Sequence, residues 1–491
     1  MKAKYWVTIL VLVGFIYRIV GLGSNFSFWT DEVHVAIFAR AILERGRPVL
    51  ANGYSTGVYQ WLQYWLSATS AKIFGLSELG IRFPTVVFGT LTIVAIYLLG
   101  KELFDCQTAL VAAAFTTFLR IEILWSRQAR PYQALQFFYL LGAWFIFRLS
   151  QEERFNWKYF LGFLFSGALA SLMHGLGLVV FGVGLTFLLV FRPRWLERKW
   201  VGFGLSLFSF FLLIFKSQIF SVASFLGKTD NLFYYRVFLW HNYRLLFFLA
   251  VMGFLFLVFR KKLNWQLPFS FLIVQGIIIS FFLNQPFTRY LYPIFPFFIL
   301  FSAFGLTVGI RLVCERIKRF LKYSWLESLA IFCLTLLIIV FGTKFAPFPQ
   351  KSYSLNEDMQ EIPEVDWNKV YGYMKEKLSQ DESLKLVANW NDLTVWYLGE
   401  GKLNYLVRKP SENPQVEDSL SGAKIIYSLT ELEETVTEGK GLLIIDSWDN
   451  QVPEGVRGYV QTNLKREIIL DRLYPFQPRY WSVEVFSWGQ N

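Results

Sequence analysis

The sequence predicts a polytopic α-helical membrane protein that carries an additional C-terminal α/β domain. Of its 491 residues, 54% are hydrophobic and only 17% are charged, a balance that soluble chains of this length do not have. Apolar runs long enough to cross a bilayer recur through the first two thirds of the chain. After about residue 345 the composition turns polar, with short apolar strands. We therefore expect a membrane module at 1–344 and a C-terminal domain at 345–491.

The net charge of +12 would indicate a nucleic-acid partner in a soluble protein. Here the basic residues gather in short loops between apolar runs, which is how membrane proteins fix their orientation. Two lysines precede the first apolar run, and the basic stretches 192–199, 260–262 and 311–322 fall on the same side of the predicted membrane. We therefore expect a multi-pass protein of the cell membrane with a cytoplasmic N-terminus, a first outer loop at 23–82 and an extracytoplasmic C-terminal domain.

The first span is expected at Tyr5–Leu22. No small-residue cleavage site follows it and Arg18 interrupts the run, so we expect it to be retained rather than removed as a signal peptide. Further runs have the length and hydropathy of a transmembrane helix, which makes about eleven spans in all. They are Phe83–Gly100, Thr108–Trp125, Tyr132–Leu149, Lys158–Met173, Gly175–Phe191, Trp200–Gln218, Tyr243–Arg260, Gln266–Leu283, Leu291–Ile310 and Trp325–Thr343.

The first outer loop contains two amphipathic stretches, Asp31–Arg45 and Val58–Phe74, in which apolar and polar residues alternate at helical spacing. Aromatic-rich amphipathic helices tend to lie in the headgroup plane, so we expect both stretches to be juxtamembrane helices.

The C-terminal domain is expected to alternate strands and helices. A helix is predicted at Trp367–Leu378, with Asp366 as its N-cap. Strand-like runs follow at Leu384–Asn389, Lys424–Ser428, Leu442–Asp446, Ile468–Leu470 and Trp481–Phe486. This order predicts a small α/β domain of about 130 residues. It contains no Gly-rich phosphate loop.

Two adjacent carboxylates, Asp31 and Glu32, begin the first amphipathic stretch just outside the first span. Acidic residues at this place cap a helix and favour its dipole. An ionised carboxylate at a membrane surface can also act as a general base. The sequence leaves both interpretations open, and they are compatible with each other.

Arginines stand at two other outer positions. Arg127 and Arg130 lie between two predicted spans, and Arg289 opens another. Arginines at a membrane surface often only extend toward lipid headgroups. Paired guanidinium groups also grip a phosphate with two parallel hydrogen bonds. Because these arginines face outward, against the usual charge bias, a phosphate site is a specific hypothesis.

A divalent metal site is a further open possibility. The three histidines, His34, His174 and His241, all fall on or near the outer side, where His34 or His174 would join Asp31 or Glu32 as ligands. Cys106, Cys314 and Cys333 form no metal-binding pattern. The aromatic residues Trp29, Tyr54 and Tyr59 can stack on sugar rings, although aromatic side chains at this depth commonly serve only as interfacial anchors.

These motifs together resemble the GT-C superfamily of membrane glycosyltransferases, in particular its protein mannosyltransferase, aminoarabinose transferase and dolichyl-phosphate-mannose-type branch. The resemblance covers residues 1–345. It rests on five short motifs in order: Phe28-Trp29-Thr30-Asp31-Glu32, Gly80-Ile81-Arg82-Phe83-Pro84, Ser126 to Tyr132, His174, and Arg289 to Pro296. The chain departs from some branches by having Arg130-Pro131 where they carry a second acidic residue, so the resemblance does not imply a second carboxylate at this place.

The resemblance implies the GT-C fold and a sugar donor carried on a polyprenyl phosphate. It implies a single inverting displacement in which Asp31 removes the acceptor's proton and Glu32 orients the acceptor. Arg127, Arg130 and Arg289 would hold the donor phosphate. The expected substrate contacts are Arg82, Tyr54, Tyr59, Tyr132, His174 and Tyr290. The acceptor, whether a lipid, a glycan or a protein, is not specified.

Two other classes of protein compete with this interpretation. One is an O-antigen ligase or polymerase, or an oligosaccharyltransferase-like enzyme with a larger donor; ligases and polymerases usually concentrate functional residues in one late loop. The other is a lipid or sugar transporter, which predicts ionisable residues in the middle of spans and broken helices. The early carboxylate pair and the nearly uncharged spans favour the transferase.

Overall fold

The computed structural model describes residues 3–23, 27–28, 30–57, 60–191, 193–196, 232–260, 265–282, 288–317, 325–342, 346–350, 365–447, 449–471 and 482–489. The chain divides into two compact units. The helical unit comprises Met1–Val20 and Thr85–Gln350, and the sheet unit comprises Gly21–Pro84 and Lys351–Asn491. The first loop thus clusters with the C-terminal residues, although the sequence assigns it to the membrane module.

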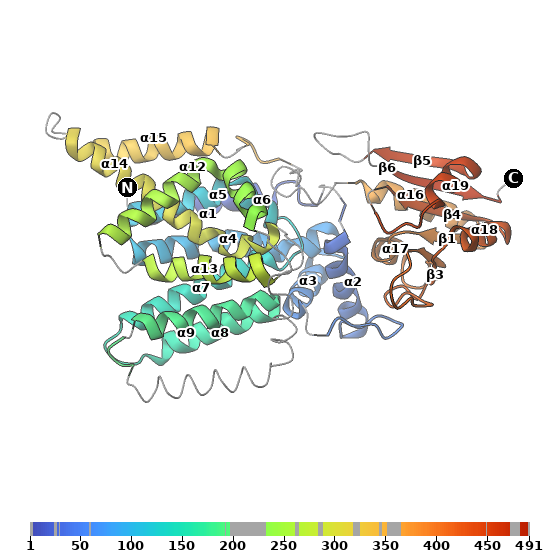
Figure 1. Cartoon of the computed structure of the whole chain (residues 1–491), viewed down its shortest axis with the longest axis horizontal. Coiled ribbons are helices and arrows are strands. Elements are labelled where there is room, and N and C mark those ends of the chain that lie inside the picture. Colours follow the sequence, from blue (N-terminus) through green and yellow to red (C-terminus); the bar gives the residue numbers. More distant parts are fainter. Residues whose placement is uncertain are drawn as a thin grey trace. The chain divides into compact units, whose positions relative to one another are not determined.

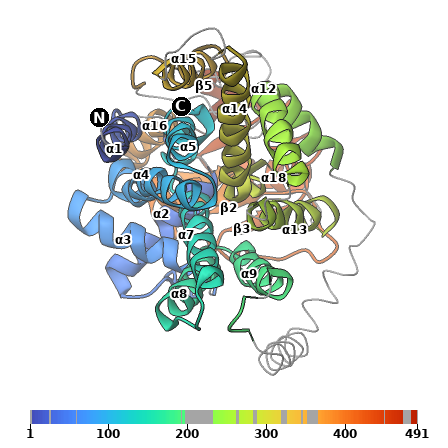
Figure 2. The same cartoon turned by 90° about the vertical axis from the view of Figure 1, so that its left-hand side faces the viewer.

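Apolar helices run side by side in the helical unit (Figures 1 and 2). Their bounds are α1 Ala3–Ile19, α4 Glu78–Leu103, α5 Cys106–Phe118, α6 Arg120–Trp125, α7 Tyr132–Gln151, α8 Trp157–Met173, α9 Leu178–Phe191, α12 Leu232–Phe259, α13 Gln266–Phe282, α14 Phe295–Ile317 and α15 Trp325–Gly342. Every predicted span in the described ranges coincides with one or more of these helices. The span predicted at Trp200–Gln218 lies outside them.

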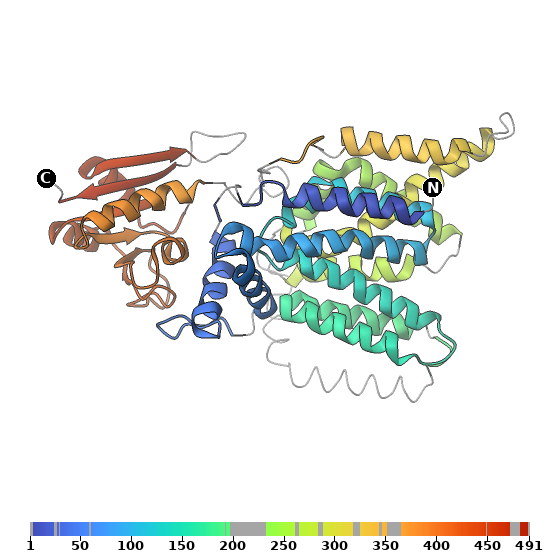
Figure 3. The ribbon, with the colours of Figure 1, turned by 180° about the vertical axis from the view of Figure 1, so that it is seen from behind.

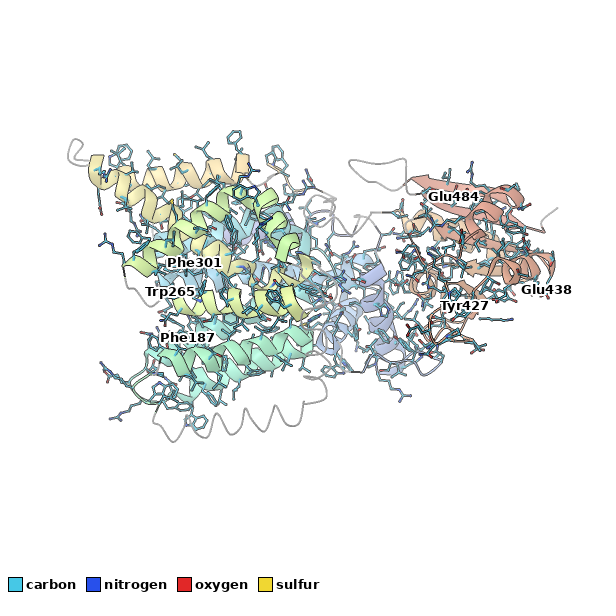
Figure 4. The ribbon with its side chains drawn as sticks, in the orientation of Figure 1. Phe187, Trp265, Phe301, Tyr427, Glu438 and Glu484 are labelled. Atoms are coloured by element: carbon cyan, nitrogen blue, oxygen red, sulfur yellow. The ribbon has the colours of Figure 1, made fainter. Side chains whose placement is uncertain are left out.

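Four helical stretches of the described chain are long and apolar enough to cross a membrane. They are Glu78–Leu103, Asn242–Phe259, Tyr292–Arg316 and Trp325–Gly342. Aromatic rings fill the space between the helices. The Phe254 ring lies 5.3 Å from that of Trp265 and 5.8 Å from that of Phe301. Figure 4 labels Trp265 and Phe301.

One predicted span is two helices. The run Thr108–Trp125 is interrupted at Leu119, which is extended (φ −60°, ψ 128°) between α5 and α6. The break leaves backbone carbonyls at the end of α5 without helical donors. The fully buried guanidinium of Arg18 donates to two of them, at 2.8 Å to Thr116 and 3.4 Å to Thr117. The arginine that interrupts the first span therefore stabilises the end of another helix.

Close backbone contact between α12 and α14 depends on two glycines. A Cβ atom on Gly305 would lie 1.9 Å from the carbonyl oxygen of Leu249, and one on Gly253 would lie 2.5 Å from that of Phe301. Small residues at such crossings let apolar helices approach closely where water supplies no hydrophobic driving force.

The sheet unit contains a six-stranded sheet with strand order β3-β2-β1-β4-β6-β5. Its first four members in this order are parallel, and β6 is antiparallel to both β4 and β5. The strands are β1 Lys385–Ala388, β2 Tyr405–Val407, β3 Lys424–Ile426, β4 Gly441–Asp446, β5 Lys465–Asp471 and β6 Ser482–Trp488. The α/β class predicted for the C-terminal domain is confirmed.

Helices α16 Trp367–Gln380, α17 Asn391–Leu398, α18 Leu429–Thr437 and α19 Val456–Asn463 accompany this sheet (Figure 3). Side chains of β1, β2, β3, β4 and β6 that point to one face form a core with Leu432 of α18 and with Val456 and Val460 of α19. Asp366 caps α16 by accepting a hydrogen bond from the Lys369 amide, as predicted.

The two helices expected in the first outer loop are present as α2 Thr30–Arg45 and α3 Trp61–Phe74. They pack against each other, and α17 of the C-terminal domain packs on α2. The candidate carboxylates therefore lie on a helix that packs against two other helices of the same compact unit.

Candidate functional site

Glu32 and Arg82 form a buried ion pair in the sheet unit. Arg82 Nε donates to Glu32 Oε1 at 2.8 Å, and Arg82 Nη2 donates to Oε2 at 2.8 Å. Their side chains are 1% and 3% exposed. Arg82 also lies 4.8 Å from the ring of Phe28 and donates to the Ser27 carbonyl at 3.3 Å. The structure joins Glu32, predicted to orient the acceptor, to Arg82, predicted to contact substrate. Both roles stay predictions.

Asp31 lies in the first turn of α2 and is half-buried. A negative charge in this position is stabilised by the positive end of the helix dipole. Its charge reaches a second carboxyl, Asp392, in the first turn of α17. Burial, and then the charge of Asp31, raise the pKa of Asp392 to about 7, against the opposing effects of the Leu393 amide and of Arg408. Sequence reasoning missed Asp392 because its neighbour in space is remote in the chain.

Two further candidates of the first loop, His34 and Tyr54, contact the ring of Phe38. The His34 ring lies 5.9 Å from that of Phe38, and the Tyr54 ring lies 6.2 Å from the same residue. Trp29 and Tyr59 lie outside the described residues. Within the described ranges, no three His, Cys, Asp or Glu side chains come together in a group that could hold a metal ion.

In the helical unit, three separate motifs of the sequence converge. The ring of His174 lies 5.5 Å from that of Tyr132 and 6.1 Å from that of Tyr290. The Arg130 guanidinium lies 5.5 Å from the Tyr132 ring, and the Arg289 guanidinium lies 5.7 Å from the Tyr290 ring. We call these five residues the basic–aromatic cluster. Their proximity agrees with the prediction that these motifs share one location.

His174 is neutral in this cluster. It lies between α8 and the following helical turn, outside the predicted spans. Burial, and then the charges of Arg130 and Arg289, lower the pKa of His174 to about 4. Its Nδ1 accepts a hydrogen bond from the Leu176 amide at 3.1 Å, so the neutral ring carries its proton on Nε2. The cluster thus combines two guanidinium groups with an imidazole N–H donor, a combination that suits a phosphate.

Arg127 lies elsewhere than its sequence neighbour Arg130 suggests. It is 2% exposed, and its Nη1 donates to the carbonyl oxygens of Arg18 at 2.9 Å and of Val20 at 2.7 Å. These carbonyls belong to the end of α1, which has no helical donors for them. The contacts give Arg127 a structural role as a cap and do not support the phosphate contact that the sequence predicts for it.

A buried polar network that the sequence did not reveal lies behind the cluster. The Tyr292 hydroxyl is 2.8 Å from Glu122 Oε2 and 2.6 Å from Gln133 Oε1. Gln136 Nε2 donates to Glu122 Oε1 at 3.1 Å. Trp125 links the network to the cluster, since its ring lies 5.6 Å from that of Tyr292 and 5.2 Å from that of Tyr132. A pair of glutamines three residues apart in an apolar helix is the signal that could have revealed it.

Comparison with known protein families gives a match over residues 61–219 to dolichyl-phosphate-mannose-protein mannosyltransferase. Among curated proteins, an uncharacterised protein of Aquifex aeolicus is 30% identical over 202 residues. This match covers 40% of the chain and 39% of that protein, so the chain matches less than half of the length of this relative.

Solved structures similar to the chain include two of ArnT from Cupriavidus metallidurans. The apo state superimposes with a TM-score of 0.59 at 13% identity, covering 99% of this chain and 98% of that one. The undecaprenyl-phosphate-bound state gives 0.55 at 13% identity, with the same coverage of 99% and 98%. AglB, the oligosaccharyltransferase of Archaeoglobus fulgidus, in complex with an inhibitory peptide and a dolichol-phosphate, gives 0.56 at 12% identity, covering 90% and 69%. At these identities the similarity establishes the fold.

Proposed function

We propose that this chain is an inverting glycosyltransferase of the GT-C type, a proposal supported by the family match over residues 61–219 and by the similarity of its fold to those of ArnT and AglB. It moves a sugar from a polyprenyl-phosphate donor to a lipid, glycan or protein acceptor on the extracytoplasmic side of the membrane. The observation that carries the proposal is the convergence of Arg130, His174 and Arg289 in one cluster.

The cluster is proposed to bind the donor phosphate. The leaving group is a phosphate, which needs its developing charge neutralised rather than a proton supplied. Arg130 and Arg289 supply positive charge, and the Nε2–H of His174 supplies a directed hydrogen bond. Tyr132 and Tyr290 line the same place and would contact the sugar or the phosphate. The structures of ArnT and AglB with undecaprenyl phosphate and dolichol-phosphate support a polyprenyl phosphate as the carrier.

Asp31 is proposed as the general base. As an acceptor oxygen or nitrogen forms its bond to the anomeric carbon, its proton passes to the Asp31 carboxylate. The bond from that carbon to the phosphate oxygen breaks on the opposite face, so the configuration inverts and the phosphate leaves with the electron pair. Glu32 is held by Arg82, which makes it a poorer choice for this role and favours Asp31.

The proposed orientation explains why the donor would be a lipid. Nucleotide sugars are made in the cytoplasm, whereas the proposed site faces the opposite side. A sugar attached to a lipid carrier arrives laterally within the bilayer.

The test is transfer by the purified full chain in lipid nanodiscs, supplied with polyprenyl-phosphate hexoses and pentoses and with lipid, glycan and peptide acceptors. Release of polyprenyl phosphate and the mass and anomeric configuration of the product are measured. Asp31→Asn should abolish transfer. Glu44→Gln is the matched control, because Glu44 lies on the same helix with its side chain 48% exposed. Transfer retained by Asp31→Asn would overturn the assignment of Asp31 as the base. Sugar transport by the wild-type protein without any transfer would overturn the proposal that the protein is an enzyme.

A further inference from the structure

Arg40 of α2, the helix that carries Asp31 and Glu32, binds helix α17 of the C-terminal domain. Arg40 of α2 donates from Nη2 to the Val395 carbonyl at 2.7 Å and from Nη1 to the Trp396 carbonyl at 3.0 Å. Its guanidinium also lies 4.8 Å from the Trp396 ring. The Val395 carbonyl also accepts a hydrogen bond from the Gly399 amide at 3.2 Å, and the last carbonyls of a helix form the negative end of its dipole. Arg40 therefore satisfies the end of α17 by hydrogen bonds, charge and ring contact together.

Trp396 connects this contact to the carboxylates. Its ring meets that of Phe28 edge-on at 5.5 Å. Phe28 also lies 4.8 Å from the Arg82 guanidinium, and Arg82 binds Glu32. The contacts thus form a closed ring that leaves α2 at Glu32 and returns to it at Arg40. These residues are eight positions apart, about 12 Å along a helix.

A second attachment reinforces the first. Glu400, which follows α17, accepts a hydrogen bond from the Ala51 amide at 2.7 Å and pairs with Arg45 at 2.9 Å. Asn52 donates to the Ser419 carbonyl at 2.8 Å. The segment after α2 therefore also contacts the C-terminal domain. This second contact limits rotation of α2 about the contact between Arg40 and α17.

We propose that α17 of the C-terminal domain positions Asp31, with Arg40 and Trp396 as its positioning residues. The inference rests on the proposed function, since it concerns the same general base. Neither residue touches the reacting atoms; both act by fixing α2. A displacement of about 1 Å in a reacting group can lower a rate about 100-fold, so a base on a short helix needs such support.

The first experiment measures transfer by the full chain with Arg40→Gln. We expect kcat to fall about 30- to 100-fold while KM for donor and acceptor stays within about threefold, because substrate binding is intact and only the base is misplaced. Arg40→Lys keeps a cation over the Trp396 ring but not the paired donors, and should recover part of the loss. Arg47→Gln, at an exposed arginine just beyond α2, is the control. An unchanged kcat, or a change confined to acceptor KM, would overturn the proposal.

The second experiment does not depend on activity. Hydrogen exchange of the amides of Thr30–Arg45 is compared in wild type, Arg40→Gln and Arg47→Gln. We expect faster exchange in α2 of Arg40→Gln alone. If Arg40→Gln fails to fold, Trp396→Phe, which keeps a smaller ring, takes its place in both experiments.

The two experiments separate the two ideas. If Asp31→Asn is inactive while Arg40→Gln is fully active, Arg40 does not position Asp31. The proposed function is unaffected by that result. A wild-type protein that transfers nothing would sink the function. Hydrogen exchange of the α2 amides would then test whether Arg40 fixes α2. Equal exchange in Arg40→Gln and Arg47→Gln would refute that role.

Discussion

Arg82 and Glu32 are joined by two hydrogen bonds of 2.8 Å although they are 50 residues apart in the chain. Both side chains are almost completely buried. Burying two charges is costly, and their attraction repays this only when the geometry is good. The paired geometry meets that condition, and it connects the start of α2 to the start of α4.

Removing one member of this pair should strongly destabilise the sheet unit. Glu32→Gln leaves the buried charge of Arg82 without its carboxylate, and we expect a loss of about 3–5 kcal/mol. The double variant Glu32→Leu with Arg82→Met should lose less, because no charge remains buried. The stabilities of both variants are measured by unfolding the full chain in detergent and monitoring the unfolding by limited proteolysis. Equal stability of Glu32→Gln and the exposed-site variant Glu44→Gln would contradict the prediction.

We expect the basic–aromatic cluster to determine the affinity for the lipid carrier. Arg130→Gln and Arg289→Gln should each weaken binding of undecaprenyl phosphate by about 10- to 100-fold, since a hydrogen bond to a charged group contributes about 1.5–3 kcal/mol. Binding to protein in nanodiscs is measured by competition with a labelled polyprenyl phosphate. His174→Ala should have a smaller effect in the same direction. Full affinity in both arginine variants would place the phosphate elsewhere.

Arg127 should behave differently from its neighbour Arg130. Arg127→Gln removes the donor that caps α1, which should cost about 1–3 kcal/mol of stability. The affinity for undecaprenyl phosphate should stay within about twofold of wild type. Thermal unfolding and competition binding of undecaprenyl phosphate distinguish the two roles of Arg127. A large loss of affinity with unchanged thermal stability would show that Arg127 binds the phosphate.

We expect the titration of Asp392 to make the free energy of unfolding depend on pH. Its carboxyl has a pKa of 3.8 in the unfolded chain and about 7 in the folded one. Between these values the unfolded state releases the proton while the folded state keeps it, so the contribution of Asp392 to stability is full below pH 4 and is lost as the pH rises to 7. The total change is on the order of 4 kcal/mol. Asp392→Asn should remove this dependence, and thermal unfolding from pH 4.5 to 8 measures it. The same slope in wild type and variant would contradict the assignment.

The sequence predicted what depends on local composition. Apolar length located the apolar helices of the described residues, and binary patterning located α2 and five of the six C-terminal strands. It missed the three-residue strand β2 and the helices α17, α18 and α19, which have eight or nine residues each, because such short elements have few residues in which to show a period. It also treated Arg127 and Arg130 alike, because only tertiary packing shows that one caps α1 while the other joins His174. Asp392 was missed for the same reason, since its proximity to Asp31 is set by the docking of α17.

The grip of Arg40 on α17 also has a consequence for biosynthesis, because Arg40 and Val395 are 355 residues apart. At about 5–20 residues per second, the ribosome needs on the order of 20–70 s to add that many residues. The Glu32–Arg82 pair can close soon after α4 emerges, whereas α2 must wait for nearly the whole chain before its second support exists. A nascent or prematurely terminated protein would therefore expose Phe28 and the Arg40 side of α2, a surface that quality-control proteases could recognise until translation is complete.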